Sequence, residues 1–231
     1  MSSLHRETAP DRPRYRHRTA MAVLATAALP IAALADGLTV TVADQAGHPV
    51  ADAVVMLEPA AGQGVGTWLP PAPVMAQRGV LFEPFVLPVR VGATVSFPNL
   101  DDIRHHVYSF SPARRFELRL YGKDETKTEV FDKSGVVALG CNIHDNMLSY
   151  ILVTAHPVYA TTDAAGRARF AGLPPGQWMT FAWHPDLEGD RGERAGPALV
   201  AAKDGGAETA IRLDLRASRR GQRAPQEGAY H

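Results

Sequence analysis

The segment Gly140-Cys141-Asn142-Ile143-His144-Asp145-Asn146-Met147 contains the only cysteine of this 231-residue chain. A histidine follows that cysteine by three residues, and a methionine follows the histidine by three more. Thiolate, imidazole and thioether groups are the soft and borderline ligands that suit copper. One Cys and two His in a plane, with a long axial Met, describe a blue-copper centre. The segment therefore predicts a copper site that still needs a second histidine.

A second segment, Asn99-Leu100-Asp101-Asp102-Ile103-Arg104-His105-His106-Val107, follows the strand-like run at 93–97 and can supply that histidine. Side chains alternate across a strand, so His105 and His106 cannot both point at one metal from extended backbone. We expect one of them to face inward. Asn99 and backbone N–H groups near Asn142 are candidates to hydrogen-bond the thiolate and set its potential.

Composition predicts globular material with a sizeable core, because 45% of the residues are hydrophobic and 21% are charged. The first 35 residues carry five arginines against two acidic residues, which leaves 19 basic and 22 acidic residues in the remainder. A net charge of −3 argues against a nucleic-acid partner.

The first 35 residues are basic and then apolar, and they end in Ala33-Leu34-Ala35, the small-x-small form of a signal-peptidase site. We expect residues 1–35 to be a signal peptide and the mature protein to be periplasmic or secreted. An uncleaved anchor is the alternative. After cleavage we expect no membrane association. A single exported cysteine has no partner for a disulfide, which favours a role in metal binding.

Alternating apolar residues predict an all-β protein with many short strands. Residues 38–42 and 53–57 are expected to form one β-hairpin around the turn Asp44-Gln45-Ala46-Gly47. The Gly- and Pro-rich residues 61–74 indicate a linker, and residues 75–156 a β-sandwich. Between 111 and 129 the pattern leaves strand or short helix open. The tail 216–231 has few apolar residues and is predicted to be disordered.

The two site segments resemble the two halves of the cupredoxin copper site, with loop spacing similar to amicyanin. The resemblance extends to exported proteins of the methylamine utilization type, through Phe97-Pro98-Asn99 and His105-His106-Val107-Tyr108-Ser109-Phe110. It implies a Greek-key β-sandwich over 75–156 that binds one type 1 copper through His105, Cys141, His144 and Met147. His106 stands where the family has Asn, and Asp145 where it usually has Pro.

The flanks resemble a transthyretin-type, carboxypeptidase-regulatory-like sandwich, through the Asp44-x-x-Gly47 and Asp163-x-x-Gly166 motifs and Leu173-Pro174-x-Gly176. Residues 36–60 alone offer too few strands for a stable domain. We therefore expect residues 36–60 and 157–215 to form one split domain into which the cupredoxin is inserted. This arrangement requires the chain to lie close together at residues 61 and 157.

These observations favour an exported carrier of single electrons that works with a redox protein, either a dehydrogenase or a cytochrome. No pattern for catalysis stands out, and four protein ligands leave no position for a small-molecule substrate, so we expect no enzyme activity. A copper chaperone or store without a redox duty is the alternative, and an interaction module without metal is a third. Asp101, Asp102 and Asp145 are either an acidic rim that steers a basic partner or a solvated loop.

Overall fold

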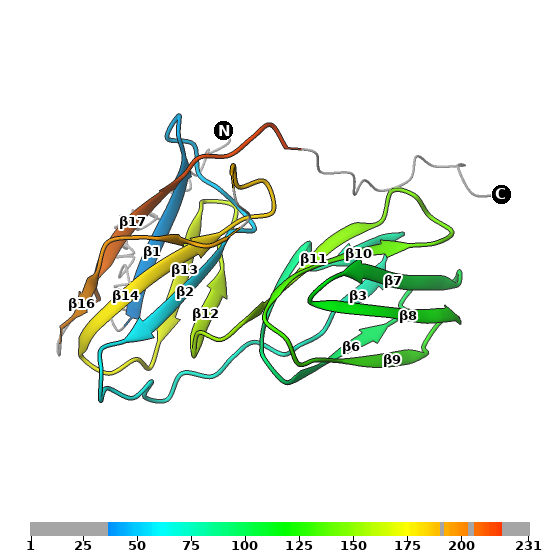
Figure 1. The fold of residues 1–231 in the computed structure, drawn as a ribbon, viewed down its shortest axis with the longest axis horizontal. Helices are drawn as coiled ribbons and strands as arrows, with labels where there is room; N and C mark the ends of the chain where they lie inside the picture. The colour runs from blue at the N-terminus through cyan, green and yellow to red at the C-terminus, as the bar shows by residue number, and fades with distance from the viewer. Residues whose placement is uncertain (1–36, 190–191, 203–205, 219–231) are drawn as a thin grey trace, which may run out of the picture. The chain divides into compact units, whose positions relative to one another are not determined.

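A computed structural model describes residues 37–189, 192–202 and 206–218 (Figure 1). These residues form strands, turns and loops without a helix, which confirms the predicted all-β class. The expected signal peptide at 1–35 and residues 219–231 of the expected tail lie outside the described residues. Among the residues described, no helix is long and apolar enough to span a membrane.

Two sheets enclose the first core. One sheet has the order β13-β1-β17 and the other the order β12-β2-β14-β15, with β16 also paired to β14. The bounds are β1 Gly37–Asp44, β2 Val54–Pro59, β12 Val158–Thr161, β13 Arg167–Ala171, β14 Gly176–Trp183, β15 Arg194–Ala195, β16 Leu199–Ala201 and β17 Glu208–Leu213. Val40 and Phe170 from the first sheet and Leu57 and Trp178 from the second are buried in one cluster. The two sheets therefore form a sandwich.

The expected hairpin between residues 38–42 and 53–57 is wrong. β1 pairs antiparallel with β13 and parallel with β17, whereas β2 pairs with β12 and β14 in the other sheet. The turn at Asp44 does form, and Ala43 makes an isolated bridge to Pro49. Beyond it the chain crosses to the opposite sheet, so Val55 and Leu57 of β2 face the same core as β1, whereas Val54 and Met56 lie in another buried cluster.

A second core lies under a five-stranded sheet of order β5-β11-β10-β7-β8, with the pairs β6–β9 and β3–β4 completing it. The bounds are β3 Ala76–Arg78, β4 Leu81–Glu83, β5 Val86–Arg90, β6 Ala93–Pro98, β7 His105–Ser111, β8 Arg114–Tyr121, β9 Thr126–Phe131, β10 Gly135–Cys141 and β11 Leu148–Thr154. Val107 and Leu139 of the larger sheet are buried with Phe97 of β6 and Phe131 of β9.

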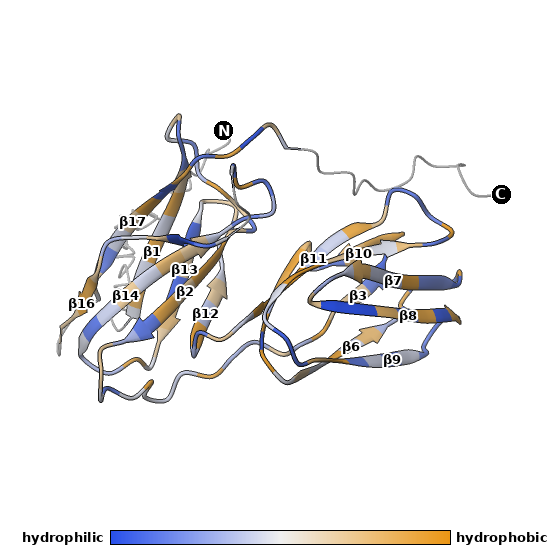
Figure 2. Cartoon of the chain, viewed as in Figure 1, coloured by the Kyte–Doolittle hydropathy of each residue, from blue (hydrophilic) through white to orange (hydrophobic). Residues whose placement is uncertain are grey.

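The segment between 111 and 129, open at the level of sequence, contains β8 and β9. Figure 2 shows both hydrophobic and hydrophilic residues along β7 and β8, and buried positions alternate over the first five residues of β7, as expected for a strand with one face on a core. Phe116 and Leu118 pack on the second core, whereas Arg119 points to solvent.

The chain leaves the first sandwich after β2 and returns to it at β12. These two strands are paired directly, with Leu57 opposite Val158. The residues between them include the linker, which contains turns and an isolated bridge at Val74, and the strands β3 to β11. The pairing brings the two crossings of the chain side by side, and the inserted domain stays a prediction.

Candidate metal centre

Cys141 is the last residue of β10 and lies opposite Val107 of β7. Along β10 the buried positions alternate, so Val137, Leu139 and Cys141 face the second core. The thiol is free and 4% exposed. Strand periodicity therefore places the sulfur inside the sandwich, at the end of a strand where a loop can reach it.

His105 begins β7 and has no exposed surface. His106 lies on the opposite face, where its Nε2 contacts Glu117 Oε1 at 2.7 Å. A register irregularity between His105 and Val107 interrupts the pairing of β7 with β8. Bulges of this kind re-aim side chains. The structure thus directs the ring of His105, and not that of His106, toward Cys141.

The loop after Cys141 brings His144 back to the sulfur. The Asn142 amide donates to the His106 carbonyl at 3.0 Å, and the Met147 amide donates to the His144 carbonyl at 3.1 Å. Cys141 Sγ lies 3.5 Å from His144 Nδ1 and 3.8 Å from His105 Nδ1. Ligand atoms of all three residues lie within 4.8 Å of one another, and His144 is 6% exposed.

These distances suit a metal that the two nitrogens and the sulfur share. With bond lengths of about 2.3 Å to sulfur and 2.0 Å to nitrogen, as zinc shows, an angle of about 110–120° separates the donor atoms by roughly 3.5–3.7 Å. The distance of 3.5 Å to His144 lies in that range, and the distance of 3.8 Å to His105 lies just above it. A thiolate with two imidazoles is also a donor set that copper prefers. The residues present therefore fit the predicted metal.

Met147 is 2% exposed and belongs to the same core cluster as Cys141. Its place in the loop, directly before β11, is fixed by the bond from its amide to His144. The structure therefore holds Met147 in the core beside the ligand loop. Its role as an axial ligand stays a prediction.

Asn99 is fully buried, and its amide makes different contacts from the one expected. Nδ2 donates to the carbonyls of Ile103 at 2.8 Å and Tyr121 at 3.1 Å, and Oδ1 accepts from the Asp101 amide at 2.9 Å. Both amide protons are used by backbone oxygens. Asn99 therefore organises the loop before His105 and does not bond the thiolate in this structure.

Asp101 is the surrounding residue that sequence reasoning missed. We expected either a place on an acidic rim or a solvated loop, but its Oδ2 lies 2.9 Å from His105 Nε2 and its side chain is only 12% exposed. The side chain of the adjacent Asp102 is 86% exposed, as expected of a residue on such a rim, and it pairs with Lys123. The spacing of four residues between Asp101 and His105 was visible in the sequence, but the turn that holds the carboxylate was not.

Electrostatics at the cluster favour a charged sulfur. Burial raises the pKa of the Cys141 thiol, but the bond to His105 and the amides of His106 and Ile143 outweigh it, so the pKa lies below its ordinary value. Burial lowers the pKa of His105, but its contacts with Cys141 and Asp101 leave it raised.

The pKa values of His144 and Asp101 are both lowered, which suits a neutral metal ligand and an ionised carboxylate. Burial and the charge on His105 both lower the pKa of His144, which favours the neutral imidazole that binds metals. Burial raises the pKa of Asp101, but the Val80 amide and His105 outweigh it, so the pKa is lowered and the carboxylate stays ionised.

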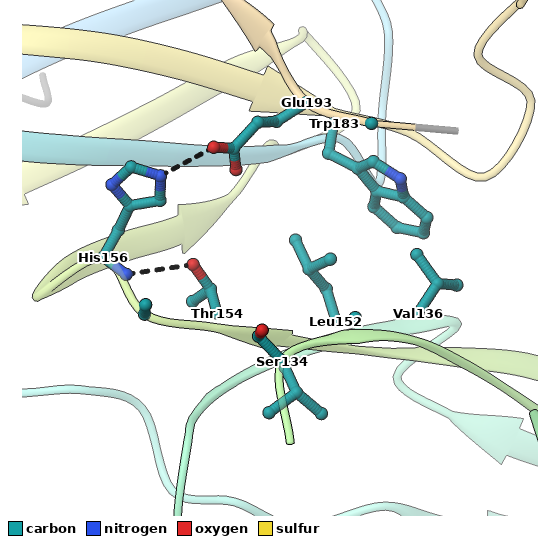
Figure 3. A pocket seen from close by; sticks show the side chains of 11 residues that line it. Ser134, Val136, Leu152, Thr154, His156, Trp183 and Glu193 are labelled. Carbon is teal, nitrogen blue, oxygen red and sulfur yellow. Dashed lines mark hydrogen bonds and ion pairs between the residues drawn. The ribbon is translucent and has the colours of Figure 1, made fainter. Parts of the chain in front are cut away.

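A separate pocket of about 560 Å³ has an apolar wall that includes Val136, Leu152 and Trp183 (Figure 3). His156 stands at its edge, with its Nε2 2.9 Å from Glu193 Oε1. None of the predicted site residues and no sulfur atom is among the described residues that line it. We therefore treat it as distinct from the metal cluster.

No protein-family model and no curated protein sequence matches the chain. Among solved structures, a purple cupredoxin from Nitrosopumilus maritimus is 20% identical, covering 36% of this chain and all of its own, with a TM-score of 0.33. A copper-containing nitrite reductase from Thermus scotoductus SA-01 is 28% identical, covering 39% of this chain and 24% of its own, with a TM-score of 0.35. A reduced amicyanin mutant is 22% identical, covering 45% of this chain and 99% of its own, with a TM-score of 0.33. Each of these three similarities covers less than half of this chain.

Proposed function

We propose that this chain is an exported copper protein of the cupredoxin class that carries single electrons between redox partners. The observation that carries the proposal is the buried cluster of Cys141, His105 and His144, with sulfur–nitrogen distances of 3.5 and 3.8 Å. A metal ion bound by all three residues would lie between a thiolate and two imidazoles, a donor set that copper prefers.

In this proposal His105, Cys141, His144 and Met147 hold one type 1 copper, which supplies one-electron chemistry. The chain's contribution is a fixed geometry. Cys141 and His105 belong to paired strands, and His144 is held by a short loop that is closed by backbone hydrogen bonds at both ends. Ligands that do not move between oxidation states lower the reorganisation that electron transfer requires. Burial also keeps water from the site.

The carrier role excludes substrate chemistry at the metal, because four protein ligands leave no open position. We propose a dehydrogenase or cytochrome as the partner and the periplasm or the exterior as the location. The second part of the proposal is that the copper domain, residues 75–156, is inserted into a transthyretin-type sandwich formed by 36–60 and 157–215. The pairing of Leu57 with Val158 supports it.

A copper titration of the purified protein tests the carrier role. One equivalent of Cu(II) is expected to give an intense absorption band at roughly 600 nm from copper–thiolate charge transfer, which ascorbate bleaches and oxidation restores. Cys141→Ser removes the thiolate and is expected to abolish the band. Asn146→Ser, at an exposed position of the same loop, is the matched control and should keep it.

Two results would contradict the carrier role. A band that persists in Cys141→Ser shows that the ligands are misassigned. A wild-type protein that binds copper as Cu(I) without colour, and does not cycle, favours a copper store or chaperone.

A further inference from the structure

His105 has a different anionic partner on each ring nitrogen. Nδ1 lies 3.8 Å from Cys141 Sγ, whereas Nε2 lies 2.9 Å from Asp101 Oδ2. An ionised carboxylate only accepts hydrogen bonds, so Nε2 carries the proton of this bond. The lone pair of a neutral ring then resides on Nδ1 and points into the cluster. Carboxylate–histidine pairs of this kind orient metal ligands and raise their basicity.

The carboxylate of Asp101 is itself held in place. The Gly79 amide donates to Oδ1 at 2.6 Å, and the Val80 amide donates to Oδ2 at 3.0 Å. The backbone of Asp101 is held by the side chain of Asn99. With these donors on both oxygens, the carboxylate can stay charged although it is only 12% exposed.

The turn that supplies the two amides has a strained backbone. Gly79 and Val80 join β3 to β4 with φ of 60° and 58°. Such φ values cost glycine little, but a β-branched residue with positive φ is a genuine outlier. Strain of this kind persists where the surrounding structure over-determines it, and it clusters at functional sites. Here it directs two neighbouring N–H groups at one carboxylate.

We propose that Asp101 is a positioning residue that holds His105 in the Nε2-protonated tautomer and biases bound copper toward Cu(II). The inference rests on the proposed function. A more basic imidazole and a nearby negative charge both stabilise the more highly charged ion. The effect passes through His105, because Asp101 makes its contact at the nitrogen that faces away from the sulfur.

The test compares Asp101→Asn with Asp102→Asn in the copper-loaded full chain. Asp101→Asn keeps the size of the side chain but removes its charge and weakens the bond to His105. Asp102→Asn removes one charge from the adjacent residue, whose side chain is 86% exposed and pairs with Lys123. We expect Asp101→Asn to lower Cu(II) affinity by about 10- to 100-fold and to lower Cu(I) affinity less.

A tenfold change in the ratio of the two affinities raises the reduction potential by about 59 mV for a one-electron couple. We expect at least that shift in Asp101→Asn and less than a threefold change in the ratio for Asp102→Asn. Equal shifts in the two variants would overturn the proposal, because a general loss of negative charge would then explain them.

A measurement on the unmodified protein covers the case in which Asp101→Asn fails to fold or to bind copper. In the diamagnetic Cu(I) form, long-range ¹H–¹⁵N spectra should show the proton of His105 on Nε2, protected from solvent exchange. A proton in rapid exchange, or a metal on Nε2, would overturn the role of Asp101. If the wild-type protein binds no copper at all, that result overturns the proposed function and this inference with it.

Discussion

Gln77 and Tyr121 form a polar pair in the core that carries the metal cluster. The Tyr121 hydroxyl donates to Gln77 Oε1, and Gln77 Nε2 donates to the Met75 carbonyl at 3.0 Å. Both side chains are almost completely buried. The carbonyl of Tyr121 also accepts from Asn99, so the pair supports the loop before His105.

Replacing Tyr121 by Phe should therefore destabilise the protein. Y121F leaves Gln77 Oε1 buried without its donor, which costs about 1–3 kcal/mol of unfolding free energy. Urea unfolding of the metal-free protein measures the loss. Tyr108→Phe is the control, because Tyr108 is only half-buried and lies on the outer face of β7, and we expect a loss below about 0.5 kcal/mol. Equal losses in the two variants would contradict the assignment.

At the residue scale, the sequence was most informative where chemistry and periodicity agree. The rarity of cysteine and its three-residue spacing to His144 indicated two residues that the structure brings together. Strand alternation required only one of His105 and His106 at the site, and the resemblance to cupredoxins selected His105. The partner of His105 was not predictable in the same way. It depends on a turn at Gly79, 22 residues before Asp101 in the chain, and no local pattern connects the two.

Two turns of the first sandwich are built alike. In each, an Asp side chain accepts from amides two and four residues on, and the Gly three residues on has positive φ, 89° at Gly47 and 70° at Gly166. They differ in their surroundings. A Cβ on Gly47 would meet open space, whereas one on Gly166 would lie 2.5 Å from the Val42 carbonyl oxygen.

Alanine substitutions at these two glycines should therefore differ in effect. Gly47→Ala meets the penalty of a left-handed backbone, about 1–2 kcal/mol. Gly166→Ala meets the same penalty and must also displace β1, so a larger loss of unfolding free energy is expected. Chemical denaturation of the two variants under the same conditions measures the difference. A Gly166→Ala loss equal to or below that of Gly47→Ala would show that β1 is not held against the turn.

At the element scale, the presence of strands was predictable but their pairing was not. β1 alternates apolar and polar residues and β2 begins with four apolar residues, and neither pattern shows whether the strands pair with each other or face each other across a core. The turn motif at Asp44 favoured the hairpin. The structure instead pairs β1 with β17, which lies almost at the end of the described residues. Contacts over such long separations leave no signal in a local pattern.

At the scale of the whole molecule, two buried clusters occupy the two sandwiches. One contains Phe170 and the other contains Phe97, the latter together with Cys141. The three tryptophans of the chain lie in or against the first cluster or the smaller cluster around Trp183. Trp183 shares its cluster with Phe85, Val86 and Leu152 of the 75–156 part, so tryptophan fluorescence reports on the first sandwich and on that shared cluster, whereas copper colour reports on the metal site.

Truncating one phenylalanine in each core tests whether the two parts unfold separately, as the proposed insertion implies. Each Phe→Ala change costs about 3–5 kcal/mol in its own core. Phe170→Ala should lower the midpoint of the thermal transition in tryptophan fluorescence and leave the copper band nearly unchanged. Phe97→Ala should do the reverse. Transitions that move together in both variants would mean that the chain unfolds as one unit.

The central claim is that one sulfur and two imidazole nitrogens meet at a single copper ion. X-ray absorption at the copper edge of the protein loaded with one equivalent tests it most directly. We predict one sulfur scatterer at about 2.1–2.3 Å and two nitrogen scatterers at about 2.0 Å. A first coordination sphere made only of nitrogen and oxygen would contradict it.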